Sequence, residues 1–221
     1  MDDDGRLPAA VLWDLDGTIA DTEPSWIAAE NALAARHGAV WTHEDGLALV
    51  GSDLIDSGRR IRERMGLDLS PEQIVEQLLD AVQADVRRSV PWRPGARELL
   101  AELRAAGVPC ALVTMSYARL VEPVLARLPA GTFGAVVTGD AVARGKPHPE
   151  PYQLAMRTLG VEPHRCVAIE DSPTGAQSAQ TAGAHVLVVP HAVHVDGGPG
   201  RTVLRGLDGV SAADLGALVP G

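Results

Sequence analysis

The chain has 221 residues, 46% of them hydrophobic and 22% charged, which is typical of a globular protein that buries a sizeable core. Its net charge of −10 argues against non-specific nucleic-acid binding, because that binding depends on a basic surface. No segment approaches the roughly 18 to 20 continuous apolar residues of a membrane span.

Two further features concern the cellular compartment. The start, Met1–Asp4, is acidic, whereas a secretory signal begins with a basic region and continues with an apolar one. Cys110 and Cys166 each lie within an apolar run and are expected to be buried free thiols rather than a disulfide. We therefore expect a cytoplasmic protein. We also expect no membrane or nucleic-acid partner, and a monomer or weak homodimer.

The N-terminal part of the chain predicts one strand followed by helices. Residues 9–13 form an apolar run that suits a strand buried on both faces. A helix is expected next, with Pro24 early in it and Gly38 just past its end. Ser70 and Pro71 give a strong start to a later helix, as N-cap and first helical residue. The helices expected in this part cover residues 24–37, 43–50, 54–65 and 71–88.

The pattern changes at residues 91–95, where two prolines and a glycine mark a boundary. Strands and helices then alternate, which predicts right-handed crossovers and a parallel sheet with helices on both faces. The tail from residue 190 is rich in Gly and His and is expected to end in a short helix at 211–219. Between the boundary and the tail, helices are expected at 96–106, 117–128, 150–159 and 174–182, and strands at 109–113, 135–138, 166–169 and 185–189.

The expected fold is therefore α/β, with a Rossmann-like parallel sheet core and an inserted α-helical cap domain. Residues 1–21 and 92–221 are assigned to the core, and residues 22–91 to the cap. Because the insert leaves and re-enters the core near one strand end, it should lie over the carboxyl edge of the sheet.

Polar residues follow three of the predicted strands. Asp14, Thr114 and the pair Glu170-Asp171 stand at strand ends, and Lys146 lies in a loop before a helix. The carboxyl ends of parallel strands meet at one edge, where open α/β sheets bind ligands. Clustered carboxylates repel one another unless a cation lies among them, and an all-oxygen ligand set suits Mg²⁺. A hard cation beside a hydroxyl and an ammonium favours binding of a phosphate group.

Each of these residues also has an ordinary structural explanation. Asp and Gly end strands and make turns, Thr114 alone is typical of a strand end, and an isolated Lys146 is usually a solvated charge. The order of these residues along the chain, around Asp14 and Asp171, is what favours a functional site.

Two aspartates one residue apart favour covalent chemistry. A carboxylate such as Asp14, held against Mg²⁺, can attack phosphorus and form an aspartyl-phosphate. Asp16 would point to the other side, protonate the leaving oxygen and later activate the hydrolytic water. The remaining work is positioning and neutralisation of charge on the transferring phosphoryl group.

These residues resemble a known family. Residues 14–18 (DLDGT), followed by Thr114, Lys146 and Glu170-Asp171, resemble the four ordered motifs of the haloacid dehalogenase-like hydrolases. The resemblance continues through residues 170–175 (EDSPTG) and covers nearly the whole chain. It is similar to the subfamily with a helical cap after the first motif, which includes sugar-phosphate phosphatases and β-phosphoglucomutase.

The resemblance implies a role for each matched residue. Asp14 is the expected nucleophile and Asp16 the expected general acid/base, with Thr114 and Lys146 completing the catalytic set. Mg²⁺ is expected to be held by Asp14, the Asp16 carbonyl and Asp171, with Glu170 either a ligand or directly behind the ligands. The phosphoryl group is expected to be bound by Gly17, Thr114, Met115, Ser116 and Lys146.

The resemblance implies hydrolysis of a small phosphorylated metabolite, with a sugar phosphate as the expected substrate. Asp16 argues against carbon–halogen and carbon–phosphorus cleavage, because members with those activities lack this carboxylate. A phosphosugar mutase is the alternative, but Trp26, residues 51–54 and Ala118 depart from the mutase pattern. A non-catalytic binding protein is a third hypothesis, which the presence of both Asp14 and Asp16 disfavours.

Several other residues are expected to have structural positions rather than functional roles. Trp26 could stack on a sugar but is expected to belong to the core. The arginine cluster Arg59, Arg60, Arg62 and Arg64 is expected to be solvated surface. No role is assigned to His148, His191 or His194, because zinc-like ligand spacing is absent from the sequence around them.

Overall fold

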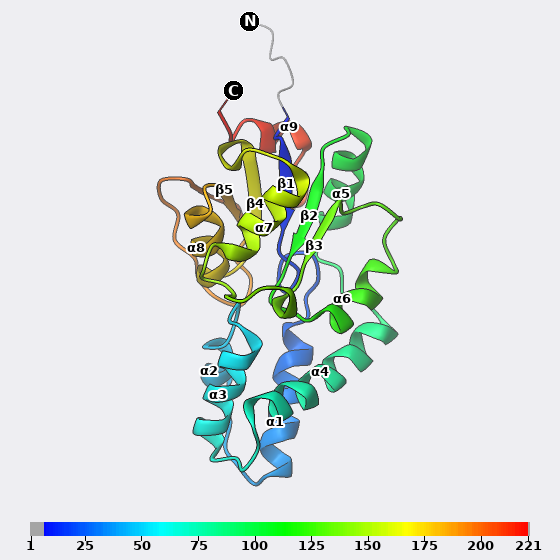
Figure 1. Cartoon of the computed structure of the whole chain (residues 1–221). Coiled ribbons are helices and arrows are strands. Elements are labelled where there is room, and N and C mark those ends of the chain that lie inside the picture. The colour runs from blue at the N-terminus through cyan, green and yellow to red at the C-terminus, as the bar shows by residue number, and fades with distance from the viewer. Residues whose placement is uncertain (1–6, 221) are drawn as a thin grey trace, which may run out of the picture.

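The computed structural model describes residues 7–220, so the acidic start Met1–Asp4 lies outside the described residues. Figure 1 shows two parts: a sheet flanked by helices, and a separate group of helices beyond the carboxyl ends of the strands. The sheet is parallel throughout, with strand order β3-β2-β1-β4-β5-β6. Its strands are β1 (Ala10–Trp13), β2 (Cys110–Val113), β3 (Ala135–Val137), β4 (Cys166–Glu170), β5 (His185–Val188) and β6 (Arg201–Val203).

β6 is a strand that the sequence analysis did not predict. It pairs with β5 at the edge of the sheet, with Val186 opposite Arg201 and Val188 opposite Val203. A strand of three residues is too short to display a recognisable alternation, and the residues before it, 197–200, are glycines and a proline that are typical of loops. The other five strands were predicted within about one residue at each end.

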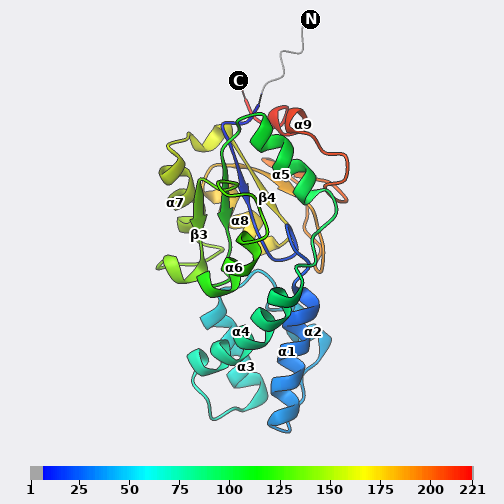
Figure 2. The ribbon, with the colours of Figure 1, turned by 90° about the vertical axis from the view of Figure 1, so that its right-hand side faces the viewer.

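The two faces of β1 explain how the core forms. Val11 and Trp13 point into one apolar cluster, whereas Ala10 and Leu12 point into another, as expected for the period of two in a strand. Figure 2 shows α5 and α7 on opposite sides of the sheet. The first cluster is covered by α5 (Ala96–Ala105), α6 (Ala118–Leu125) and α9 (Ala212–Gly216), and the second by α7 (Glu150–Leu159) and α8 (Pro173–Thr181).

Cys110 and Cys166 are both free and buried in these clusters, as expected. Short 3₁₀ turns, η1 (Gly139–Ala141) and η2 (Pro163–Arg165), complete the elements around the sheet. No helix within residues 7–220 has the length and apolar character needed to cross a membrane.

The second group of helices, here called the helical unit, lies beyond the carboxyl ends of the strands (Figure 1). Its local sequence explains its breaks: Asp53 caps one helix by accepting from the backbone N–H groups of Ile55 and Asp56, and Gly66 ends that helix in the left-handed conformation. The unit consists of α1 (Glu23–Arg36), α2 (His43–Leu47), α3 (Leu54–Met65) and α4 (Pro71–Arg88). α2 ends three residues before the predicted boundary, at tight turns.

Two linkers join the helical unit to the sheet, and they run side by side. The Asp21 N–H donates to the Pro91 carbonyl at 2.8 Å, and the Arg93 N–H donates to the Ile19 carbonyl at 2.8 Å. His191 bridges both linkers, because its Nδ1 accepts from Arg93 at 2.9 Å and its Nε2–H donates to Asp21 at 2.8 Å. His191, which received no role from the sequence, therefore ties the loop after β5 to both connections.

A further contact fixes α4 against α6. The guanidinium of Arg119 pairs with Asp80 at 2.6 Å and with Glu76 at 2.9 Å. It also donates to the Glu76 carbonyl at 3.1 Å. The helical unit is thus held over the carboxyl edge of the sheet at a defined position.

Candidate active site

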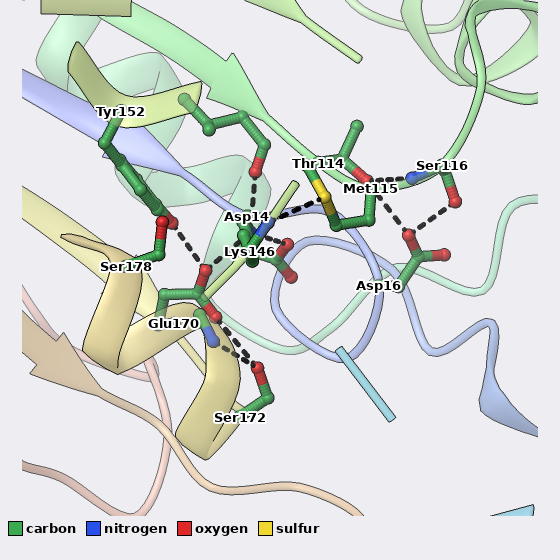
Figure 3. Close-up of polar contacts among 12 residues, drawn as sticks. Asp14, Asp16, Thr114, Met115, Ser116, Lys146, Tyr152, Glu170, Ser172 and Ser178 are labelled. Carbon is green, nitrogen blue, oxygen red and sulfur yellow. Dashed lines mark hydrogen bonds and ion pairs between the residues drawn. The ribbon is translucent and has the colours of Figure 1, made fainter. Parts of the chain in front are cut away.

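The predicted strand-end residues meet around one buried ammonium group. Lys146 is only 3% exposed, and its Nζ donates to Asp14 Oδ1 at 2.7 Å and to Glu170 Oε1 at 2.6 Å. It also donates to the Val113 carbonyl at 2.9 Å, at the end of β2. Figure 3 shows Asp14, Lys146, Glu170 and Tyr152 converging from separate elements. The sheet therefore brings together residues that lie more than a hundred positions apart.

Charge in this cluster is unbalanced. Burial raises the pKa of Asp14 to about 8, despite the opposing effect of Lys146. Burial also raises the pKa of Asp171 well above its ordinary value, and the neighbouring charges of Asp14 and Glu170 add to this effect. Burial acts to lower the pKa of Lys146, but Asp14 and Glu170 outweigh it and raise that pKa. One ammonium thus faces three carboxyl groups.

The same cluster fits a divalent cation. Asp14, Glu170 and Asp171 offer carboxylate oxygens that lie within 4.8 Å of one another. The second oxygen of Asp14, Oδ2, is buried and has no hydrogen-bond partner within residues 7–220. A buried anionic oxygen is costly unless it is paired, and hard cations take such oxygens as ligands. The donor set therefore suits an oxygen-seeking cation better than a soft metal.

Two glycines allow this crowding. Gly17 has a φ of +82°, and a Cβ there would lie 2.0 Å from Asp171 Oδ2. At Gly175 a Cβ would lie 2.1 Å from the Glu170 carboxylate. Gly17 is predicted to bind phosphate, and the structure adds a packing reason for glycine at this position.

Asp16 lies apart from the cation cluster. Its carboxylate accepts from Thr114 Oγ1 at 3.1 Å and from Ser116 Oγ at 2.7 Å (Figure 3). From the helical unit it accepts from Thr22 Oγ1 at 2.5 Å and from Trp26 Nε1 at 3.4 Å. The side chain of Asp16 thus points away from Asp14, as the sequence predicted, and it is held from both the sheet and the helical unit.

The predicted phosphate-binding residues surround Asp14 and Asp16. Thr114 and Ser116 direct their hydroxyls to Asp16, and the Ser116 N–H donates to Thr114 Oγ1 at 2.9 Å. The Lys146 N–H donates to Met115 Sδ at 3.2 Å, which places Met115 against the lysine loop. The structure brings every predicted site residue to one edge of the sheet, and their roles in catalysis are predictions.

A cavity opens above these residues, between the sheet and the helical unit. On the sheet side it is lined by Asp14, Asp16, Met115, Ser116, Lys146 and Asp171. On the helical side Trp26 lines the cavity and also packs against the apolar core, which agrees with the core position expected for it. The arginine cluster at residues 59–64 is exposed, as expected, and does not line the cavity.

Two carboxyl groups line the helical side. Burial raises the pKa of Glu23 to about 7, and the nearby charges of Glu30 and Asp16 add to the effect. Burial also raises the pKa of Glu30 to about 7, against the opposing hydrogen bond from Trp41. Glu30 lies in α1 and accepts from Trp41 Nε1 at 2.8 Å.

The raised pKa of Glu30 predicts a pH-dependent stability effect of Glu30→Gln. The folded-state pKa of about 7 lies above the ordinary value of 4.5, so the fold favours the protonated carboxyl. Its stabilising contribution is complete below the unfolded pKa and is lost as the pH rises through about 7. Glutamine carries no charge at any of these pH values. The free energy of unfolding of the variant, relative to that of the wild type, should therefore be higher at pH 8 than at pH 5 by on the order of 2 kcal/mol. Urea unfolding at both pH values measures the difference, and an equal difference at both would contradict the prediction.

Sequence reasoning missed Tyr152 and the Glu30–Trp41 pair. Tyr152 is fully buried on α7, and its hydroxyl donates to Glu170 Oε1 beside the lysine. In the sequence, Tyr152 is one apolar position of a helix, and nothing distinguishes it from a core residue. A glutamate at an inward position of α1 was the one available signal for Glu30, because buried carboxylates are rare.

Comparisons with known proteins point to one family. A family model described as haloacid dehalogenase-like hydrolase matches residues 11–189. Hexitol phosphatase A of Escherichia coli is 37% identical over 183 residues, covering 80% of this chain and 81% of that protein. The N-acetylmuramic acid 6-phosphate phosphatase of Pseudomonas aeruginosa is 35% identical over 199 residues, covering 86% of this chain and 85% of that protein.

Solved structures agree with this relationship. CbbY from Rhodobacter sphaeroides, in complex with phosphate, superposes with a TM-score of 0.84 at 28% sequence identity. The match covers 95% of this chain and 99% of that chain. The similarity therefore includes the helical unit as well as the sheet.

Proposed function

The chain belongs to the haloacid dehalogenase-like hydrolase family and is a phosphoric monoester hydrolase acting on phosphorylated metabolites; we propose that its substrate is a sugar phosphate. We also propose that it requires Mg²⁺ and that it acts in the cytoplasm. The observation that carries the proposal is the buried Asp14–Lys146–Glu170–Asp171 cluster beneath a cavity that also contains Asp16. We propose that the helical unit, residues 22–91, acts as a cap domain on the core formed by residues 1–21 and 92–221.

Asp14, Asp171 and the Asp16 carbonyl would hold Mg²⁺, with Glu170 beside them. Bound Mg²⁺ neutralises charge on the transferring phosphoryl group. Lys146 contributes a second positive charge and holds Asp14 in place at 2.7 Å. The unpartnered Oδ2 of Asp14 supports this assignment, because a cation would supply the partner that the protein does not.

The chemistry proceeds in two steps. In the first, an oxygen of Asp14 forms a bond to phosphorus while the bond from phosphorus to the leaving oxygen breaks, and Asp16 gives that oxygen a proton. In the second, Asp16 takes a proton from water as the water oxygen attacks the aspartyl-phosphate. Phosphate and the free Asp14 carboxylate result. The donors from Thr22, Thr114 and Ser116 hold Asp16 in one orientation for both transfers.

A phosphatase panel tests the proposal. Purified protein is incubated with sugar phosphates, polyol phosphates and p-nitrophenyl phosphate, with Mg²⁺ or with EDTA, and released phosphate is measured. We expect release that depends on Mg²⁺. The absence of release from every compound would refute the proposed phosphatase.

The mutase alternative has less support from the site. A mutase needs a subsite for a second phosphate, yet Lys146 is the one cationic side chain among the described residues that line the cavity. Conversion of β-glucose 1-phosphate to the 6-phosphate, dependent on a bisphosphate activator, would establish the mutase instead. A non-catalytic binding role is disfavoured, because a protein that only binds its ligand would not need both Asp14 and Asp16.

Replacement of Asp16 by alanine should slow both proposed steps. We expect kcat for a sugar phosphate to fall by about 10²- to 10⁴-fold, the usual contribution of a general acid or base. p-Nitrophenolate leaves without a proton, so with p-nitrophenyl phosphate the variant should show a burst of one product per site followed by slow turnover. Rapid-mixing absorbance measures the burst, and unchanged rates of both steps would show that Asp16 is not the acid/base.

A further inference from the structure

The helical side of the cavity differs in charge from its floor. Within residues 7–220, the ionisable groups that line the helical side are the two carboxyls of Glu23 and Glu30. Ser52 and Ser57 add hydroxyl groups, and most of the remaining lining is apolar. Lys146 lies at the floor, already paired with Asp14 and Glu170. This side of the cavity therefore offers hydrogen bonds but no positive charge.

Glu30 is built into this wall rather than exposed on it. The residue is 5% exposed, and Trp41 Nε1 donates to its Oε2 at 2.8 Å. Gly46 closes over the same oxygen, since a Cβ at that position would lie 2.9 Å from Oε2. Trp41 is the one donor to this carboxyl within residues 7–220, so Oε1 keeps its full acceptor capacity at the cavity wall. Oε1 is not enclosed by the protein, unlike Asp14 Oδ2, so a hydroxyl of a ligand in the cavity can reach it and donate to it.

We propose that Glu30 determines specificity by accepting a hydrogen bond from a hydroxyl of the leaving group. The site then takes monophosphates of uncharged, polyhydroxylated compounds and rejects compounds that carry a second phosphate or a carboxylate. This inference rests on the proposed phosphatase function and narrows its substrate class.

Electrostatics and geometry favour this ligand over the alternatives. A second phosphate near Glu30 would meet an acceptor where it needs donors, with no cation to offset the repulsion. An apolar leaving group would cover Oε1 without offering it a donor, so the oxygen would lose its contact with water and gain nothing in return. A hydroxyl supplies one donor and no charge, which matches a single open acceptor.

The test compares the wild type with Glu30→Gln and with a matched control, Glu63→Gln. Glutamine keeps an oxygen for Trp41 and replaces the open acceptor by an amide that donates. Glu63 is an exposed residue of α3, so its substitution makes the same charge change away from the cavity. kcat/KM is measured at about pH 8, where Glu30 is ionised, for sorbitol 6-phosphate, fructose 1,6-bisphosphate, 6-phosphogluconate and glucosamine 6-phosphate.

We expect the wild type to prefer sorbitol 6-phosphate over the bisphosphate and over 6-phosphogluconate by about 100-fold or more. Glu30→Gln should reduce both ratios by about tenfold, chiefly through a higher KM for sorbitol 6-phosphate, and Glu63→Gln should keep them within about twofold. Ratios in Glu30→Gln that equal the wild-type ratios would overturn the proposal. A preference for glucosamine 6-phosphate of more than about tenfold would overturn it too, because the site would then select a cation.

A binding measurement separates this inference from the proposed function. Calorimetry with the same compounds, on Asp14→Asn with and without Glu30→Gln, reports discrimination without turnover. If the wild type released phosphate from none of the compounds, including p-nitrophenyl phosphate, the phosphatase proposal would fail and the binding ratios would still decide the role of Glu30. If turnover is normal and both sets of ratios are unaffected by Glu30→Gln, the inference alone fails.

Discussion

Asp14→Asn should lower kcat by roughly 10⁴-fold or more while leaving the protein folded. An amide cannot attack phosphorus as a carboxylate does, so the first step loses its nucleophile. The fold should survive, because Lys146 can still donate to the amide oxygen at the position of Oδ1. Burial raises the pKa of Asp14 to about 8, which means that the metal-free fold disfavours its charge. The variant should therefore resist heat at least as well as the metal-free wild type above that pH.

The measurement is phosphate release with Mg²⁺, beside circular dichroism of each protein. Asp68→Asn is a suitable control, because Asp68 is exposed in the helical unit and the chemical change is the same. The control should retain wild-type turnover. Activity of Asp14→Asn within about tenfold of the wild type would refute the nucleophile assignment.

The fold was largely predictable because its elements carry strong local signals. The two faces of β1 are both buried, so residues 10–13 form an uninterrupted apolar run. Asp53 and Gly66 mark the two ends of α3, and Ser70 marks the start of α4; the predicted limits of both helices agree with the structure. β6 was missed because it is short and lies at the edge, where pairing with β5 rather than its own sequence makes it a strand.

The residues of the site could be predicted as far as the topology of the sheet could be predicted. Once the strands are parallel, Asp14, Thr114 and Glu170-Asp171 must share an edge, and the motif order supplies Lys146. Contacts that depend on packing of helices could not be foreseen. Tyr152 reaches Glu170 from α7, and His191 reaches Asp21 from the tail, across 170 positions.

The helical unit also combines helices that the local sequence predicts with contacts that it does not predict. Its helices follow from local patterns, but which residues face the cavity depends on how α1, α2 and α4 pack. Trp41 approaches Glu30 because the chain turns back after α1, and the sequence of neither residue signals the other. Substrate selectivity is therefore the property that is hardest to predict from the sequence, since it depends on this packing.

Lys146→Met should destabilise the metal-free protein by about 3 to 5 kcal/mol, because it removes the cation from a buried ion pair. Lys146 is the single lysine of the chain, and its ammonium is the only group that donates a hydrogen bond to the carboxylates of both Asp14 and Glu170 among the described residues. Without it, two buried carboxylates lose their counter-charge, and the Val113 carbonyl loses a donor. Methionine keeps the length and the apolar stem, so the loss comes from charge rather than from a cavity. Activity should also fall, since Asp14 loses the group that holds it.

Thermal unfolding with EDTA and with Mg²⁺ measures this effect. In EDTA the melting temperature should fall by roughly 6 to 20 °C. Mg²⁺ should raise it more in Lys146→Met than in the wild type, because the cation then neutralises carboxylates that no ammonium balances. Arg144→Met is the matched control, since Arg144 lies in the same loop but is 68% exposed and pairs with Glu150 at 3.4 Å. An exposed pair of this kind contributes at most about 1 kcal/mol. If both variants lost equal stability, the charge balance of the buried cluster would not be what holds Asp14 and Glu170 together.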